Sequence, residues 1–270
     1  MDTKEVEGTI IKRVSEALRR WEAQQADHDV PSPSGIAHCF RQQWAKATKQ
    51  QITNPDQLAW IKNMEQGKLV EPFWSDIFRL AGFTVADLNE RLVIAGGPMT
   101  GVGDRMITDD TGEIAIPLLL ELKNLGPFTY YELLAHGLKN GAPGYYYQVQ
   151  SYMEMYNIPM AVIFAGQAEA SSITWWWRVR EKKQSGPNAS EWPPPFIVEV
   201  VERAPADFAW AQQRAVDVRW YADNVTDMAQ VPRDYDPTQK KYKTPDGRNK
   251  TIPCTYCPVL DACLVAGERL

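Results

Sequence analysis

The chain has 270 residues, 44% of them hydrophobic and 23% charged, and a formal net charge of −5. This composition is that of an ordinary globular protein that is long enough to bury a sizeable core. The charge excludes a strongly basic nucleic-acid coat protein, and no apolar run reaches the roughly 18 residues of a membrane span. We therefore expect a cytoplasmic protein without a membrane partner, whose four cysteines are thiols or metal ligands rather than disulfides.

Apolar periodicity and turn residues divide the chain into alternating groups of helices and strands. The predicted helices cover residues 5–25, 36–44, 55–81, 128–138, 143–157 and 206–227. The predicted strands cover residues 91–95, 102–107, 114–123, 160–165, 173–179 and 196–202. Helices, a compact set of strands, helices and further strands are typical of an α/β core with additional helices around it.

The strands over 102–107 and 114–123 carry the most informative residues. The turn signal that begins at Asp109 joins them as a hairpin. Side chains alternate along a strand, so Glu121 and Lys123 project on one side, and the hairpin sets Asp104 beside them. Taken alone, Glu121 and Lys123 are also typical of an exposed ion pair. Two adjacent carboxylates, however, repel unless a cation separates them, and oxygen ligands suit Mg²⁺ or Mn²⁺.

Three more polar residues lie on predicted helices. Gln148 and Tyr152 are four residues apart and therefore on the same helical face, where an amide and a phenol can hold a phosphate or orient Lys123. Glu71 lies on a helix whose other face is apolar, and it is a candidate for an additional carboxylate of the site. Each of these residues is also compatible with an ordinary surface or core position.

These residues occur in the order of the motifs of the PD-(D/E)XK nucleases. Glu71, Gly101 to Asp104, Glu121 to Lys123, and Gln148 to Tyr152 resemble the RecB-like branch, which includes CRISPR-associated and AddB-type nucleases and many phage exonucleases. Gly103 replaces the family's proline, and Glu71 stands where many RecB-like members have histidine. The resemblance covers residues 32–264. It implies a restriction-endonuclease-like α/β core, a mixed central sheet flanked by helices, with a helical N-terminal region and a C-terminal iron–sulfur segment.

The resemblance implies a metal-dependent DNA exonuclease of recombination, repair or phage DNA processing, in a bacterium or a phage-infected host. The implied ligands of Mg²⁺ or Mn²⁺ are Glu71, Asp104, Glu121 and the backbone carbonyl of Leu122. The implied catalytic residues are Lys123, which orients or deprotonates water, with Glu121, Asp104, Gln148 and Tyr152. The alternative is a non-catalytic or endonucleolytic DNA-processing subunit of a larger complex, such as one for CRISPR adaptation.

The four cysteines form a second candidate site. Cys39 stands alone, and Cys254, Cys257 and Cys263 lie within ten residues near the C-terminus. Four thiolates can hold Zn²⁺ or an iron–sulfur cluster. The resemblance to AddB-type and CRISPR-associated nucleases implies a structural [4Fe–4S] cluster, with zinc as the alternative.

The resemblance also sets the expected domains and partners. We expect an N-terminal helix over 1–30, a nuclease domain over 31–230, and a cysteine segment over 231–270 that pairs with Cys39. DNA, as single strands or ends, is the expected substrate, and a homo-oligomer or a recombination partner is compatible with the family. A basic patch with an aromatic residue can follow a single strand, although it also suits a solvated loop. Its basic residues are Lys240, Lys241, Lys243, Arg248 and Lys250.

Overall fold

The computed structural model describes residues 32–50, 57–94, 99–112, 114–167, 196–235, 239, 241–243, 249–251, 257 and 262–264. The chain divides into two compact units. The sheet unit comprises residues 33–37 and 66–214, and the cysteine unit comprises residues 1–32, 38–65 and 215–270.

Sixteen helical and extended elements are described along the chain. They are η1 (Pro33–Gly35), α2 (Phe40–Ala47), α3 (Gln57–Leu80), β1 (Phe83–Asp87), β2 (Leu92–Val93), β3 (Thr100–Gly101), β4 (Arg105–Asp109), β5 (Leu118–Leu125), α4 (Pro127–Gly141), α5 (Pro143–Met155), β6 (Met160–Gln167), β7 (Phe196–Glu202), α7 (Pro205–Asn224), η2 (Met228–Gln230), β8 (Lys241–Lys243) and β9 (Asn249–Thr251).

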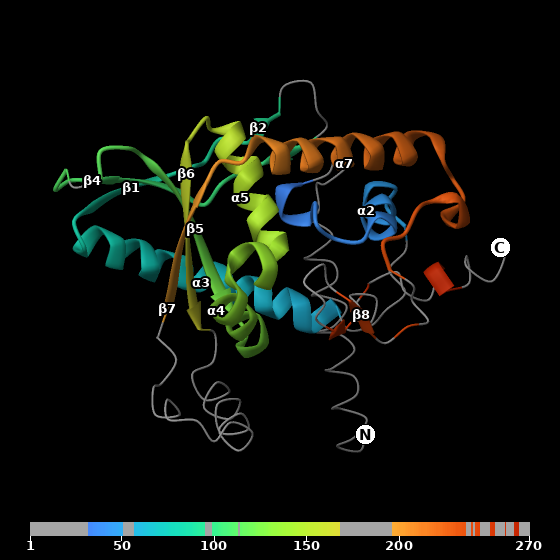
Figure 1. Ribbon diagram of the computed structural model, residues 1–270, viewed down its shortest axis with the longest axis horizontal. Coiled ribbons are helices and arrows are strands. Elements are labelled where there is room, and N and C mark those ends of the chain that lie inside the picture. The colour runs from blue at the N-terminus through green and yellow to red at the C-terminus, as the bar shows by residue number, and fades with distance from the viewer. Residues whose placement is uncertain are drawn as a thin grey trace, which may run out of the picture. The chain divides into compact units, whose positions relative to one another are not determined.

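A five-stranded mixed sheet in the order β1-β4-β5-β6-β7 forms the centre of the sheet unit (Figure 1). β5 and β6 run parallel, and every other pair of neighbours is antiparallel. A parallel pair needs a crossover connection, which α4 and α5 supply. Both helices begin with a proline, Pro127 and Pro143, whose fixed φ suits the first helical position. The predicted fold class, a mixed sheet flanked by helices, is confirmed.

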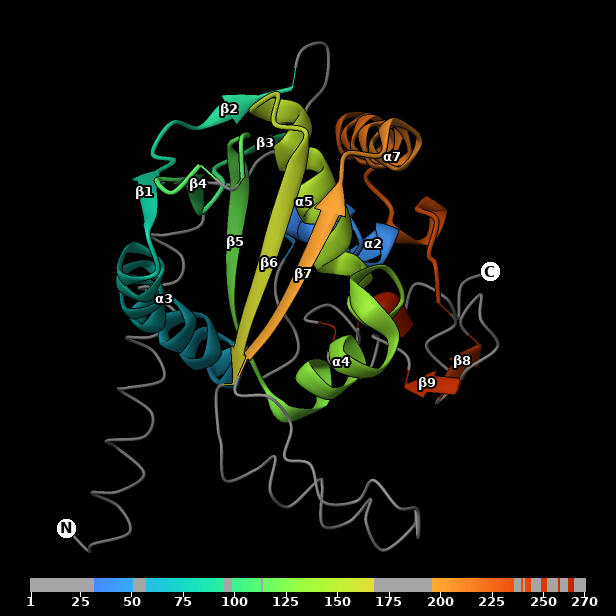
Figure 2. The same cartoon turned by 60° about the vertical axis from the view of Figure 1, so that its left-hand side comes forward.

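Helices cover both faces of the sheet (Figure 2). The alternation of β5 divides its side chains between two cores. Leu120 and Leu122 pack in one core with Trp74 of α3, whereas Leu119 and Leu125 pack in the other with residues of α4 and α5. β5 is thus buried on both sides, which explains its nearly continuous apolar sequence.

The helix α3 packs on the sheet through a face that the sequence did not indicate. Its rings Trp74 and Phe78 contact Phe164 of β6, at centroid distances of 4.6 and 5.3 Å. The apolar residues that recur at helical spacing along α3 are exposed instead, namely Leu69, Phe73, Ile77 and Leu80. Trp74 and Phe78 are partly buried against the core that contains β5 and β6, so they define the face of α3 that packs. Glu71 consequently lies on the side of α3 near the sheet rather than opposite the packed face.

The cysteine unit has a core of its own around α2. Phe40 and Trp44 pack with Val218 and Val231, and with the two cysteines described in the C-terminal segment. The indole of Trp44 donates a hydrogen bond to the carbonyl of Tyr221 at 3.1 Å. Residues near position 40 and residues after position 215 therefore form one packed unit.

The predicted elements agree with the structure in most of the described residues. The hairpin of β4 and β5 is present, and its turn is fixed by Asp109, which accepts hydrogen bonds from the backbone amides of Thr111 and Ile114. The strand β1 was missed. The predicted helix over 5–25 and the predicted strand over 173–179 lie outside the described residues. The predicted domain boundaries stay a prediction. No helix in the described part of the chain is sufficiently long and apolar to cross a membrane.

Candidate active site

Glu121 and Lys123 lie on β5 with side chains on the α4 and α5 side, in alternation with Leu120 and Leu122. Glu121 is fully buried, and 16% of the Lys123 side chain is exposed. The Lys123 ammonium donates a hydrogen bond of 2.5 Å to Oε1 of Glu121. The pair is therefore inside the molecule, unlike the exposed ion pair that the two residues suggest when taken alone.

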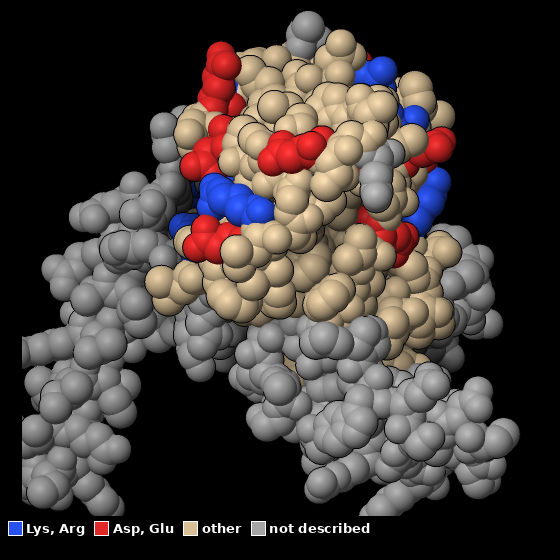
Figure 3. Space-filling model, turned by 90° about the vertical axis from the view of Figure 1, so that its left-hand side faces the viewer, with Lys and Arg blue, Asp and Glu red and all other residues tan. Residues whose placement is uncertain are grey.

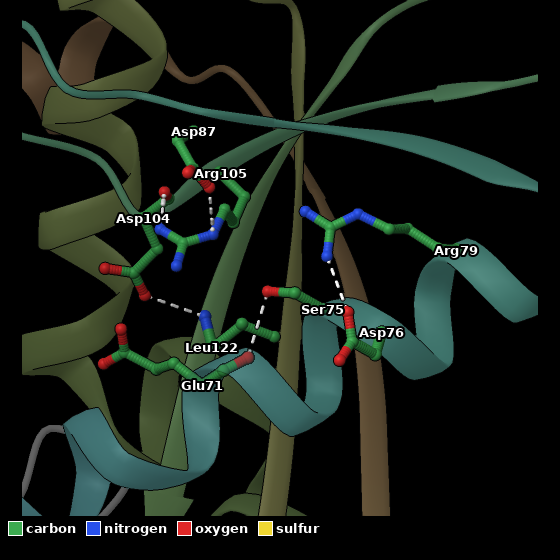
Figure 4. Close-up of polar contacts among 8 residues, drawn as sticks. All are labelled: Glu71, Ser75, Asp76, Arg79, Asp87, Asp104, Arg105 and Leu122. Carbon is green, nitrogen blue, oxygen red and sulfur yellow. Dashed lines mark hydrogen bonds and ion pairs between the residues drawn. The ribbon is translucent and has the colours of Figure 1, made fainter.

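Asp104 immediately precedes the first residue of β4, at the point where β5 loses its β4 neighbour and stays paired only with β6. The register pairs Arg105 with Leu120, so the backbone of β5 has no β4 partner beyond that point. The Asp104 carboxylate takes the place of the missing strand and accepts a hydrogen bond of 2.9 Å from the backbone amide of Leu122 (Figure 4). Its Oδ2 also lies 4.0 Å from the Lys123 ammonium. The end of β4 thus brings Asp104, Glu121 and Lys123 together.

The Glu121 carboxylate is only half satisfied. Its Oε2 is buried and has no hydrogen-bond partner among the described residues. Burial and the negative charge of Asp104 raise the pKa of Glu121 to about 8, against the opposing charge of Lys123. A buried carboxylate with an unused oxygen and a second carboxylate beside it is suited to binding a cation or a proton.

Lys123 is held in its charged form. Burial favours the neutral amine, but the carboxylates of Glu121 and Asp104 outweigh burial and raise the pKa of Lys123. The ammonium also lies 5.3 Å from the centre of the Tyr145 ring, within the range of a cation–π contact. In this arrangement Lys123 can donate a hydrogen bond to water but cannot accept a proton from it.

Glu71 extends from α3 toward the same carboxylates. Figure 4 shows its carboxylate on the same side as that of Asp104. Burial, followed by the charge of Asp104, raises the pKa of Glu71, and Lys123 opposes the shift. Glu71 is therefore electrostatically part of the cluster, and its role as a metal ligand stays a prediction.

Gln148 and Tyr152 form the wall of the site on α5. Both are buried, and a hydrogen bond joins the amide to the phenol. Burial and the charge of Glu121 raise the pKa of Tyr152. The backbone of Gly101 passes so close that an added Cβ would lie 2.7 Å from the Tyr152 ring. The glycine therefore permits the approach of the phenol to the carboxylates.

The carboxylates of the site are not arranged around a common metal position. In the described ranges, no three side chains of His, Cys, Asp or Glu are already arranged as metal ligands. The position between Glu121 and Asp104 is taken by the Lys123 ammonium. The donor set still fits Mg²⁺ or Mn²⁺, because it consists of carboxylates with an unused buried oxygen. The predicted role of the Leu122 carbonyl stays a prediction.

The described cysteines belong to the cysteine unit. Cys39, Cys257 and Cys263 are buried, and Cys254 lies outside the described residues. The guanidinium of Arg41, itself buried, donates from Nη1 to Sγ of Cys263 at 3.3 Å and from Nη2 to the carbonyl of Val231 at 2.6 Å. A buried cation beside sulfur suits an anionic thiolate ligand.

The predicted basic patch is described in part. The hairpin of β8 and β9 pairs Lys241 with Thr251 and Tyr242 with Lys250, and the Lys241 side chain is exposed. Lys243 is on the same hairpin, whereas Lys240 and Arg248 lie outside the described residues. On the face shown in Figure 3, acidic and basic side chains are interspersed among uncharged ones, and the described residues form no continuous basic surface there.

Two residues of the site were missed from the sequence. Tyr145 is the first of three consecutive tyrosines. The only sequence signal that separates it from the other two is its position three residues before Gln148. Arg105 directly follows Asp104, and its charge lowers the pKa of Glu71, in opposition to burial and Asp104. The only sequence signal that could have placed Arg105 in the site is that it directly follows Asp104.

Comparisons with known proteins add three likenesses of fold. No protein-family profile matches the sequence, and no curated protein matches it. Among solved structures, the alkaline exonuclease LHK-Exo of Laribacter hongkongensis is similar, with 14% identity, a TM-score of 0.49, and coverage of 72% of this chain and 88% of that one. Its complex with dAMP gives 13% identity and a TM-score of 0.47 over the same shares.

A phage-related exonuclease from Haemophilus somnus 129PT has 15% identity and a TM-score of 0.42, and the match covers 61% of this chain and 72% of that chain. At such identities and TM-scores, these likenesses carry no inference about the reaction of this chain. Its function is therefore inferred from the residues of the site.

Proposed function

We propose that this protein is a metal-dependent deoxyribonuclease that hydrolyses phosphodiester bonds at DNA ends. The observation that carries the proposal is the cluster of Asp104, Glu121 and Lys123, in which an ammonium lies against two carboxylates and a buried carboxylate oxygen has no partner among the described residues. Burying these charges costs stability, because they lose their contacts with water. A catalytic role therefore explains the cluster better than a structural role does. The resemblance of the motifs to PD-(D/E)XK nucleases supplies the reaction class.

The carboxylates would hold the cation. Asp104, which precedes β4, and Glu121 of β5 offer carboxylate oxygens, and Glu71 of α3 adds a third carboxylate. A bound Mg²⁺ or Mn²⁺ lowers the pKa of water and offsets the charge that develops on the phosphate. The Lys123 ammonium contacts only Oε1 of Glu121, so Oε2 would remain available to a cation.

The other residues position water and phosphate. Lys123, once released from Glu121, can donate a hydrogen bond to the attacking water or to a phosphate oxygen. Tyr145 limits how far the ammonium can move, because its ring lies 5.3 Å from Nζ. Gln148 and Tyr152 offer an amide and a hydroxyl on the α5 side, where the phenol stays protonated because burial raises its pKa.

The direct experiment compares linear with circular single-stranded DNA in Mg²⁺ and in Mn²⁺. An exonuclease degrades end-labelled linear DNA to nucleotides and leaves the circle intact. Cleavage of the circle would replace the exonuclease by an endonuclease. DNA binding without cleavage in either metal would favour the non-catalytic alternative and would contradict the proposal.

We also propose that Cys39, Cys254, Cys257 and Cys263 hold a structural [4Fe–4S] cluster. Three of these residues are buried thiols of one packed unit, and Arg41 donates to one sulfur. The described cysteines do not yet form a metal-holding group of three, so the proposal requires the fourth cysteine and a local rearrangement.

Anaerobic purification followed by a visible spectrum and metal analysis tests the cluster. Brown colour with about four iron atoms per chain is expected, at the stoichiometry of the proposed cluster. A colourless protein with one zinc would establish the zinc alternative, and a protein without either metal would show that the cysteines are structural thiols.

A further inference from the structure

Arg105 is fixed beside the carboxylate cluster by groups from two strands. It is the first residue of β4, and its Cα partners are Asp87 of β1 and Leu120 of β5. The Nε of Arg105 lies 2.8 Å from Oδ1 of Asp87, an ion pair that is not aligned as a hydrogen bond. Its Nη1 donates a hydrogen bond of 2.6 Å to the backbone carbonyl of Asp104. The guanidinium is thus held by two of its three nitrogens.

The third nitrogen, Nη2, is unused. It makes no hydrogen bond within the described part of the chain, and it is not among the buried atoms without a partner, so solvent reaches it. The side chain as a whole is 20% exposed. In Figure 4 this nitrogen points to the side on which the carboxylates of Asp104 and Glu71 lie. The effect of Arg105 on the pKa of Glu71 is consistent with this proximity.

A phosphodiester that approaches this cluster meets three carboxylates, Glu71, Asp104 and Glu121, and one ammonium. The proposed divalent cation would neutralise part of this negative charge, and a further cation that faces the phosphate would strengthen substrate binding. A guanidinium is suited to this task because it stays charged and offers planar N–H donors that match phosphate oxygens.

We propose that Arg105 binds a non-bridging phosphate oxygen of the DNA strand next to the carboxylate cluster, with Asp87 as the residue that positions the guanidinium. The inference rests on the proposed nuclease function and assigns to it a substrate contact. The competing explanation is that Arg105 and Asp87 form only a cross-strand ion pair that stabilises the sheet.

The pair formed by Arg79 and Asp76 on α3 provides a matched control. It is also an arginine–aspartate pair, with a distance of 2.7 Å, but both side chains are about half exposed or more. Figure 4 shows it separate from the carboxylates of Asp104 and Glu71. Arg79→Met therefore removes the same charge from the same unit without touching the cluster.

The test measures DNA cleavage in Mg²⁺ and DNA binding in Ca²⁺ for wild type, Arg105→Met, Arg105→Lys, Asp87→Asn and Arg79→Met. Loss of a charged hydrogen bond to phosphate should raise KM roughly 10- to 100-fold in Arg105→Met, with a smaller change in kcat. The slope of log affinity against log salt should fall by about 0.7 to 0.9, the value for one phosphate contact.

The other variants separate the effect of the charge at position 105 from the effect of the orientation of the guanidinium. Arg105→Lys and Asp87→Asn keep a cation, so both should retain the salt slope and raise KM by less than Arg105→Met does. Arg79→Met should match wild type. If Arg105→Met behaves like Arg79→Met in KM and slope, or if Asp87→Asn reproduces the full loss, Arg105 is only a structural residue.

These outcomes also distinguish the two proposals. A wild-type protein that binds DNA without cleaving it overturns the nuclease function, and the salt slopes still decide the role of Arg105. A wild-type protein that neither binds nor cleaves DNA overturns both. If Arg105→Met is unstable, Arg105→Gln, which also removes the charge, takes its place in the comparison of KM and salt slopes.

Discussion

The buried Glu121 carboxylate makes stability depend on pH in a direction that the structure specifies. Because the pKa of Glu121 rises from 4.5 to about 8 on folding, the folded state binds a proton that the unfolded state releases. Its contribution to the free energy of unfolding is therefore present in full below pH 4.5 and is lost as pH rises through 8. Glu121→Gln should remove this contribution and so weaken the dependence of stability on pH.

The size of the effect follows from the two pKa values. Proton linkage between 4.5 and about 8 gives a loss of about 3 kcal/mol in the free energy of unfolding between about pH 5.5 and about pH 8.5. Lys123 adds nothing in this window, because its raised pKa affects stability only above its ordinary value of 10.5. The pKa of Glu71 is also raised, so Glu121→Gln should keep a weaker dependence of the same sign.

Urea denaturation in EDTA at the two pH values measures the effect, as the difference between wild type and Glu121→Gln. That difference cancels the groups that the two proteins share. Mg²⁺ should then restore stability to wild type at the higher pH, because a cation that binds only the folded state stabilises it, and should restore less to the variant. A wild-type-minus-variant difference that stays constant with pH would refute the description of Glu121 as a buried, half-satisfied carboxylate.

Three further predictions concern residues around the two sites. Arg41→Gln should lower the free energy of unfolding by about 2 to 4 kcal/mol in urea, because the buried Val231 carbonyl and Cys263 lose their donor; wild-type stability would contradict this. Gly101→Ala should cost about 1 to 3 kcal/mol and reduce cleavage, because its Cβ would meet the Tyr152 ring; thermal unfolding measures it, and an unchanged melting temperature would count against it. Tyr145→Phe should keep the rate of cleavage and Tyr145→Leu should lower it several-fold, because only the ring face contacts Lys123; equal rates would exclude the contact as functional.

The sequence predicted the parts of the fold that are specified locally. The hairpin of β4 and β5 follows from the turn residues at Asp109 and from an apolar strand, and α5 follows from the proline at its first position. β1 was missed although Phe83 and Val85 alternate, because it is a strand of only five residues next to a helix end. The exposed face of α3 was also unpredictable, since helical spacing does not show which of two apolar faces meets the sheet.

The candidate site was predictable where residues follow one another on an element. Alternation places Glu121 beside Lys123, and helical spacing places Gln148 next to Tyr152. Arg105 was not predictable as a phosphate contact, because its guanidinium is oriented by Asp87 of β1, the strand that the sequence did not reveal. The role of Tyr145 was not predictable either, because the sequence does not show which of the three tyrosines faces Lys123.

The sharpest test of the carboxylate cluster is the initial rate of nucleotide release from linear DNA in Mn²⁺ by Lys123→Ala, relative to wild type. Lys139→Ala is the matched control, because Lys139 is a half-exposed lysine paired with Asp207 at 2.8 Å. If the cluster of Asp104, Glu121 and Lys123 is the hydrolytic centre, Lys123→Ala should lose at least about 100-fold in rate, the usual scale for a group that positions or transfers a proton, and Lys139→Ala should retain the wild-type rate. Equal rates for folded Lys123→Ala and wild type would show that hydrolysis does not take place at this cluster.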